Sequence, residues 1–426
     1  MRPSQFRIVQ SSFIYSNKRS IMSTRDVDSA TAPSPASRRT RLVHAGRHPE
    51  QFGGAVNTPV VRTSTVLYPD LAAYEDSRAH KFGSLRYGRY GTQTAFALQE
   101  AMTELEGAAG AVLYPSGLAA ISSVLRALLA PGDHLLMVDS VYGPARQFCD
   151  GALRRAGVET TYFDPAIGGG IADLLRPRTR VVYGESPGSL TFEVQDLPAI
   201  AQACRRSGAL LVVDNTWASP LFHRPLELGA DVSISAATKY VVGHSDAMLG
   251  VAATNERALD AVRAGAAADG LLAGPDDCWL ALRGLRSMGA RLRQHEESAL
   301  FVAHWLARHP AVRRVLYPAL PGDPSHELWK RDFSGASGLF SFELARPDPD
   351  RLRVFIDGLA LFGIGSSWGG FESLVLPAKP VRTASHLPVE GALVRLHIGL
   401  EDPNDLVGDL ARALDAAYPD PHQQGA

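Results

Sequence analysis

An unbroken run of five apolar residues, Ala209 to Val213, ends at Asp214 and constrains the fold more than any other stretch of the chain. Such a run is typical of a parallel strand buried on both faces, as found in α/β sheets. A buried carboxylate is costly unless it is paired or hydrogen-bonded. Since open α/β sheets bind ligands at the carboxyl ends of their strands, Asp214 indicates a ligand with a cationic group at this edge.

A second short strand is predicted at residues 232–235, and it brings Thr238 and Lys239 to the same edge. An amine and a hydroxyl would then face the site of the carboxylate. This combination suits pyridoxal phosphate: Lys239 would form the Schiff base, Asp214 would keep the pyridine nitrogen protonated, and Thr238 would bind the phosphate. Taken alone, the lysine also fits a solvated loop, and the aspartate also fits a helix cap.

The sequence motifs around these residues are more specific. Residues 214–217 (DNTW), 236–240 (AATKY) and 243–248 (GHSDAM) resemble the pyridoxal-phosphate enzymes of cysteine and methionine metabolism. The resemblance runs from about Thr40 to about Tyr418, and within the family it is strongest to the branch that breaks the Cβ–S bond of cystathionine. It implies an α/β protein of fold type I, with a large, mostly parallel cofactor domain and a smaller α/β C-terminal domain.

The alternation of strands and helices from about 94 to 260 agrees with a parallel sheet of this kind. In one such unit, a small-residue turn at Pro115–Leu118 leads into a predicted helix at residues 119–129, and a helix N-terminus favours an anion. The resemblance places the amides that bind the cofactor phosphate at Gly117 and Leu118. It also assigns Tyr142, which follows another predicted strand, to stacking on the cofactor ring.

Residues 41–90 have the pattern of an extended arm, ending in a glycine-rich loop with Tyr87 and Arg89. A phenol and a forked guanidinium suit a phosphate, although an ordinary surface loop has the same composition. The resemblance implies that this loop binds the cofactor of the neighbouring subunit. The expected assembly is therefore a homo-oligomer, at least a dimer and by resemblance a dimer of dimers.

The C-terminal part carries the predicted substrate site. The loop at residues 366–374 is rich in small residues and holds a single large indole, so that its backbone can approach a ligand closely. By resemblance, Ser367 and Trp368 line the substrate site. Residues 393–400 alternate as a strand whose apolar face is opposite Arg395 and His397, and the resemblance assigns Arg395 to the α-carboxylate of the substrate.

The activity implied is β-elimination of L-cystathionine to homocysteine, pyruvate and ammonia, with Lys239, Tyr142 and Tyr87 as catalytic residues. The close rival is a γ-acting relative, a cystathionine γ-lyase or γ-synthase. Trp368 stands where the γ-acting enzymes tend to have an aliphatic residue. Ser189 stands where many of them have an asparagine, and Ala236 replaces a phosphate-binding serine of many relatives.

Four segments are expected: an N-terminal extension at 1–40, the arm at 41–90, a cofactor domain at 91–290 and a C-terminal substrate domain at 291–426. The extension is rich in Arg, Ser, Ala and Pro without steady periodicity, which is typical of disorder. A transit peptide has a similar composition. A translation start at Met22 or a loose extension is the preferred interpretation, because no amphipathic face is visible.

Composition excludes several other classes of function. The net charge of −1 does not favour nucleic acid or anionic membranes, and no apolar run is long enough to span a bilayer. Three scattered cysteines give neither a disulfide framework nor a metal site, which fits the reducing cytoplasm. The sequence lacks the GxGxxG and GxxxxGK[ST] signatures of nucleotide-binding proteins. A non-catalytic module on the same fold would be expected to have lost Lys239, Asp214 or Arg395.

Overall fold

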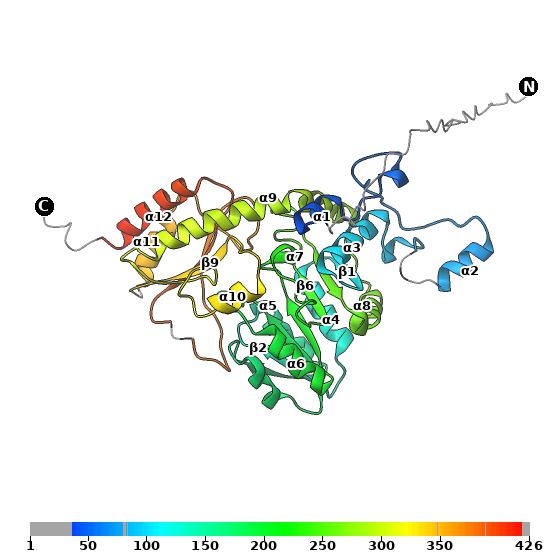
Figure 1. The fold of residues 1–426 in the computed structure, drawn as a ribbon, viewed down its shortest axis with the longest axis horizontal. Coiled ribbons are helices and arrows are strands. Elements are labelled where there is room, and N and C mark those ends of the chain that lie inside the picture. The colour runs from blue at the N-terminus through cyan, green and yellow to red at the C-terminus, as the bar shows by residue number, and fades with distance from the viewer. Residues whose placement is uncertain (1–35, 80–81, 83, 347, 388, 420–426) are drawn as a thin grey trace, which may run out of the picture. The chain divides into compact units, whose positions relative to one another are not determined.

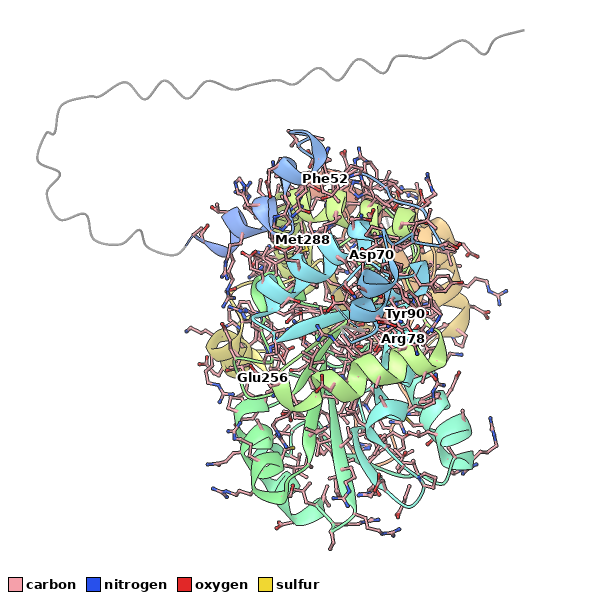
Figure 2. All side chains as sticks on the ribbon, turned by 90° about the vertical axis from the view of Figure 1, so that its right-hand side faces the viewer. Phe52, Asp70, Arg78, Tyr90, Glu256 and Met288 are labelled. Carbon is pink, nitrogen blue, oxygen red and sulfur yellow. The ribbon has the colours of Figure 1, made fainter. Side chains whose placement is uncertain are left out.

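The computed structural model describes residues 36–79, 82, 84–346, 348–387 and 389–419. The expected extension at 1–40 therefore lies outside the described residues up to residue 35. Helix α1 (Arg38–His44) spans the expected boundary between the extension and the arm, and the arm continues through α2 (Leu71–Ala79). Figure 2 shows the side of the molecule that carries the arm, with Asp70 and Arg78 marking the two ends of α2.

Among the described residues, seven strands form the larger sheet, in the order β1-β7-β6-β5-β4-β2-β3. The five strands from β6 to β3 are parallel to one another, which confirms the expected mostly parallel sheet. β7 is antiparallel to both of its neighbours, and the sequence pattern did not predict it. The strands are β1 (Gly110–Tyr114), β2 (His134–Val138), β3 (Glu159–Phe163), β4 (Thr179–Glu185), β5 (Leu210–Asp214), β6 (Val232–Ser235) and β7 (Gly250–Thr254).

Both faces of this sheet are covered, which explains why central strands such as β2 and β5 are apolar without alternation. In β1, for example, Leu113 joins one hydrophobic core and Tyr114 joins another. Helix α3 contributes to the first core, whereas α4, α6 and α8 contribute to the second. The helices are α3 (Gln93–Glu106), α4 (Gly117–Leu128), α5 (Gly143–Phe148), α6 (Leu197–Ser207), α7 (Ser219–Phe222) and α8 (Glu256–Asp269).

A single helix of 32 residues, α9 (Pro275–Leu306), connects the larger sheet to the smaller one (Figure 1). Its buried stripe includes Leu285, Leu292 and Leu306, so the apolar positions that predicted several helices belong to one. The expected domain boundary near residue 290 falls inside this helix.

The smaller sheet has the strand order β10-β11-β12-β9-β8 among the described residues. In β12, Val394 and Leu396 are buried and Arg395 is partly exposed, as the alternation predicted. His397, expected on the face of Arg395, is fully buried as well. The elements are β8 (Val312–Leu316), α10 (His326–Asp332), β9 (Leu339–Leu344), α11 (Pro349–Gly358), β10 (Gly363–Ile364), β11 (Leu374–Pro377), β12 (Leu393–His397) and α12 (Pro403–Ala417).

Candidate active site

Asp214 ends strand β5 as a buried carboxylate, with a relative exposure of 7%. Its Oδ1 accepts hydrogen bonds from the backbone N–H of Thr216 at 3.0 Å and from the Thr216 hydroxyl at 2.5 Å. Burial raises the pKa of Asp214, and the bonds from Thr216 oppose that rise only in part. A buried carboxylate with a raised pKa gains from a nearby cation, so Asp214 fits a protonated pyridine nitrogen.

A second, partly buried carboxylate, Glu185, lies beside Asp214, because the two residues pair in register at the ends of β4 and β5. Burial and the neighbouring charge of Asp214 raise the pKa of Glu185 well above its ordinary value. Its Oε2 accepts the backbone N–H of Tyr142 at 2.7 Å and so fixes the start of α5. Sequence reasoning missed Glu185, although an acid directly after an apolar strand was the same signal that singled out Asp214.

Lys239 follows β6 and points toward the same edge of the sheet. Burial, followed by the positive charge of Arg395, lowers the pKa of Lys239 to about 8, while Asp214 acts in the opposite direction. The Nζ atom donates a hydrogen bond to the Ser367 hydroxyl and lies 5.2 Å from the ring centroid of Trp368. An amine with this pKa is partly neutral near pH 8, so it can act as a nucleophile and as a base.

The N-terminus of α4 provides amides for a phosphate. Ser116 caps this helix: its hydroxyl accepts from Ala119 N at 3.1 Å and its carbonyl accepts from Ala120 N at 3.0 Å. The first two N–H groups, those of Gly117 and Leu118, remain for an anion. A Cβ on Gly117 would lie 2.6 Å from the Cβ of Ala236, so residue 236 packs directly on this turn.

The hydroxyl of Thr238, predicted to bind the phosphate, forms hydrogen bonds to the backbone of Leu249. It accepts from Leu249 N at 2.8 Å and donates to Leu249 O at 3.2 Å. Thr238 therefore holds β7 close to Lys239 in this structure. It would donate to a phosphate only by giving up its bond to the Leu249 carbonyl.

Tyr142 and Arg395 lie close enough for their side chains to interact electrostatically. Tyr142 is 44% exposed at the N-terminus of α5, where its ring is accessible for stacking. Burial lowers the pKa of Arg395, and its Nη2 donates to the carbonyl of Ser367 at 3.0 Å. The loop of Ser367 and Trp368 thus contacts both Lys239 and Arg395. The structure brings together the predicted residues of the larger sheet and those of the C-terminal part.

Tyr87 and Arg89 lie apart from these residues. Together with Arg62 and Asp276 they line a cavity of about 660 Å³ in which none of the lining residues is Lys239 or Asp214. Arg89 donates to the carbonyl of Ala267 at 2.8 Å. Within one chain the two residues therefore belong to a separate surface.

Other kinds of site have less support within the part of the chain that the structure describes. No group of three His, Cys, Asp or Glu side chains there is placed to hold a metal ion. Cys149, Cys204 and Cys278 are buried free thiols. No helix among those residues has the length and apolar character that crossing a bilayer requires.

Comparison with known proteins agrees with this geometry. Residues 39–415 match the family described as Cys/Met metabolism PLP-dependent enzyme. A putative cystathionine beta-lyase of Rhizobium johnstonii is 50% identical over 89% of this chain and 96% of its own length. Cystathionine beta-lyase MetC of Escherichia coli K12 is 47% identical over 87% of this chain and 96% of its own length. The crystal structure of cystathionine gamma synthase from Xanthomonas oryzae pv. oryzae has a TM-score of 0.83 and 33% identity, covering 90% of this chain and 99% of that one.

Proposed function

The chain belongs to the Cys/Met metabolism PLP-dependent enzymes, and on that premise we propose that it is a carbon–sulfur lyase that cleaves L-cystathionine by β-elimination. The products are homocysteine, pyruvate and ammonia. The observation that carries the proposal is the position of Lys239: its amine, with a pKa lowered by burial to about 8, lies between Asp214, Ser367 and Arg395. An amine in this setting can move a proton within a site that also holds an amino acid.

The residues present fit pyridoxal phosphate. The buried Asp214 would hold the positive charge of the pyridine nitrogen, and the free amides of Gly117 and Leu118 would bind the phosphate. The exposed Tyr142 would stack on the pyridine. When bound, the cofactor supplies an electron sink for the charge that develops at Cα of the amino acid.

The remaining roles belong to side chains of this protein. Arg395 binds the α-carboxylate through its two forked nitrogens. Lys239, neutral at Nζ, accepts the Cα proton and returns a proton to the leaving sulfur. Ser367 orients Nζ through its hydroxyl and is itself held by Arg395 through its carbonyl. The indole of Trp368 excludes water from the face of the amine.

β-Elimination, rather than the γ-chemistry of other family members, is supported by Trp368. A γ-acting enzyme must also remove a proton from Cβ, and this requires room for the amine to move along the substrate. A large ring 5.2 Å from Nζ restricts that space. The relatives of 46–50% identity over most of this chain carry the name cystathionine beta-lyase, which favours the same conclusion.

The separate location of Tyr87 and Arg89 supports a homo-oligomer in which each chain completes the site of its neighbour. We assign both residues to the cofactor phosphate of the partner subunit, with Tyr87 close to the reacting groups, and propose a dimer of dimers. Three free, buried thiols and the absence of charge bias support a cytoplasmic enzyme.

Product identification tests the proposal. Purified protein reconstituted with pyridoxal phosphate is incubated with L-cystathionine, and the oxo acid is identified. We expect pyruvate with homocysteine, and we expect Lys239→Ala to lose both turnover and the visible absorption of the bound cofactor. Formation of 2-oxobutyrate with cysteine would instead assign the protein to the γ-acting branch. Absence of any product despite bound cofactor would indicate another substrate or a non-catalytic role.

A further inference from the structure

The loop that holds Ser367 and Trp368 passes directly over Lys239 in a conformation that needs support. A Cβ built on Gly369 would lie 3.0 Å from the Cα of Lys239, so this backbone approaches more closely than a residue with a side chain normally would. Ser367 and Gly369 both have positive φ angles, of 82° and 86°. A positive φ is unfavourable for serine, and such conformations persist where the surroundings hold them in place.

His397 holds this loop from strand β12. The residue is completely buried, with 0% relative exposure. Its Nε2 accepts the backbone N–H of Gly369 at 3.0 Å, and its Nδ1 donates to the carbonyl of Glu372 at 3.1 Å. One side chain therefore spans the turn that follows Trp368, from its first residue to its last.

These two hydrogen bonds require a neutral imidazole, with one nitrogen as the acceptor and the other as the donor. Burial, followed by the neighbouring His295, lowers the pKa of His397 well below its ordinary value. The cations Arg395 and Lys239 act in the same direction. The ring consequently keeps its accepting nitrogen toward Gly369 at neutral pH.

A second contact joins His397 to the same loop through aromatic packing. The ring of Tyr240, the residue after Lys239, lies 6.1 Å from the ring of His397 and 5.6 Å from that of Trp368. Its hydroxyl accepts the backbone N–H of Gly338 at 3.0 Å, which fixes the ring. Tyr240 therefore packs near both the indole of Trp368 and the ring of His397.

We propose that His397 is a positioning residue that fixes Ser367 and Trp368 relative to the amine of Lys239. Ser367 accepts from Lys239 through its hydroxyl and from Arg395 through its carbonyl, so a displaced loop changes both groups at once. The inference rests on the proposed function in that this loop must be the one that contacts substrate. A misplacement of about 1 Å in such a loop lowers turnover by up to roughly 100-fold.

The test compares two histidines of equal burial. His397→Phe keeps a ring and removes both nitrogens, whereas His397→Gln keeps one donor and one acceptor. The matched control is His295→Phe: His295 is 0% exposed, its ring lies 5.3 Å from that of His397, and its Nδ1 bonds to the carbonyl of Ile398 instead of the loop. Hydrogen exchange of the amides at 366–373 is measured in the full-length cofactor-free protein, and kcat and KM are measured after reconstitution.

In His397→Phe we expect loop exchange to accelerate at least tenfold (roughly) and kcat to fall about 10-fold or more, with His397→Gln restoring part of both. His295→Phe should change neither by more than about twofold. Unchanged loop exchange in His397→Phe, or an equal acceleration in His295→Phe, would overturn the proposal. Should His397→Phe fail to fold, His397→Asn, which is too short to reach both ends of the turn, carries the same expectation.

The exchange measurement uses neither cofactor nor substrate, so it separates this inference from the proposed function. Faster loop exchange without any product from cystathionine would support the role of His397 and count against the assigned substrate. Normal β-elimination of cystathionine together with unchanged loop exchange in His397→Phe would support the assigned substrate and count against the role of His397.

Discussion

At the scale of single residues, the site depends on burial that alters ionisation. Burial raises the pKa of Asp214 and of Glu185, and it lowers the pKa of Lys239 and of Arg395. In the cofactor-free protein these groups are incompletely compensated, which favours binding of a ligand with both a cationic and an anionic part. Residues suited to such a ligand therefore destabilise the protein that lacks it.

Lys239 allows a test of that cost. Its pKa is about 8 in the folded protein against 10.5 ordinarily. Between these values the unfolded chain binds more protons, so stability should rise with pH from 8 to 10.5. At pH 7 we expect the free energy of unfolding of cofactor-free Lys239→Met to exceed that of the parent by up to about 3 kcal/mol, as measured by urea denaturation. The difference should vanish near pH 10.5. A difference that stays constant from pH 7 to 10 would contradict this ionisation.

Arg395 gives a second prediction at this scale. Arg395→Ala should raise KM for L-cystathionine roughly 100-fold with a smaller loss in kcat, since two charge-assisted hydrogen bonds to the carboxylate disappear. Arg395→Lys keeps the charge but loses the forked geometry of the guanidinium, so its KM should lie between those of the parent and Arg395→Ala. Steady-state kinetics with reconstituted protein provide the measurement. An unchanged KM in Arg395→Ala would remove this residue from the substrate site.

At the scale of elements, the carboxylate of Asp139 connects the end of β2 to the loop between β11 and β12. Asp139 follows β2, and the chain continues from it to Tyr142. Burial alone would raise the pKa of Asp139, but backbone N–H groups of the β11–β12 loop and the guanidinium of Arg146 outweigh it and hold the pKa well below its usual range. The donating amides, at 2.8 to 3.0 Å, are those of Thr383, Ala384 and Ser385. This contact fixes the loop that leads into β12, the strand of Arg395. It holds that loop against the end of β2, which is followed by Tyr142.

Asp139→Asn should therefore lower stability by about 3 kcal/mol at pH 7, because an amide group replaces an oxygen that faces several donors. Since the folded-state pKa is depressed, the carboxylate stabilises the fold above its unfolded pKa of about 4, and the difference from the parent should shrink as the pH falls below about 4. Urea denaturation at pH 7 and pH 3 measures this. Glu159→Gln, which breaks an exposed ion pair with Arg176, is the control and should cost under about 1 kcal/mol. Equal losses in both variants would argue against a special role for Asp139.

At the scale of the whole molecule, one chain holds Lys239 and Asp214 at one edge of the larger sheet and Arg89 at another surface. Leu67 in the arm is 89% exposed, and Leu71 at the start of α2 is 69% exposed. Exposed apolar side chains on an extended arm suit contact with a second copy of the chain. The proposed site is then complete only in the assembly.

Hybrid assemblies test this arrangement. Lys239→Ala and Arg89→Ala should each be impaired alone, but a mixed dimer contains one site with an intact Lys239 and an intact Arg89 from the other chain. Co-refolding the two variants in equal amounts should restore up to about a quarter of the parental activity, the statistical share of such sites. The unmixed variants are the controls. Hybrids demonstrated by differential tagging that stay inactive would place Arg89 outside the partner's site.

The sequence by itself determined the elements that depend on local pattern. The apolar run before Asp214, the short strand before Lys239 and the alternation around Arg395 predicted strands that the structure confirms. Asp214 and Lys239 follow from the first two strands, because parallel strands deliver their carboxyl ends to one edge.

Only the tertiary structure decided which distant segments meet. It placed β7 antiparallel between β1 and β6, set Glu185 beside Asp214, and closed the loop before β12 on Asp139. It also buried His397, which alternation had placed with the partly exposed Arg395. Local periodicity specifies which face of a strand is apolar. The partner of a polar side chain some 245 positions away is fixed only when the sheets pack, because leaving a buried donor or acceptor without a partner is costly.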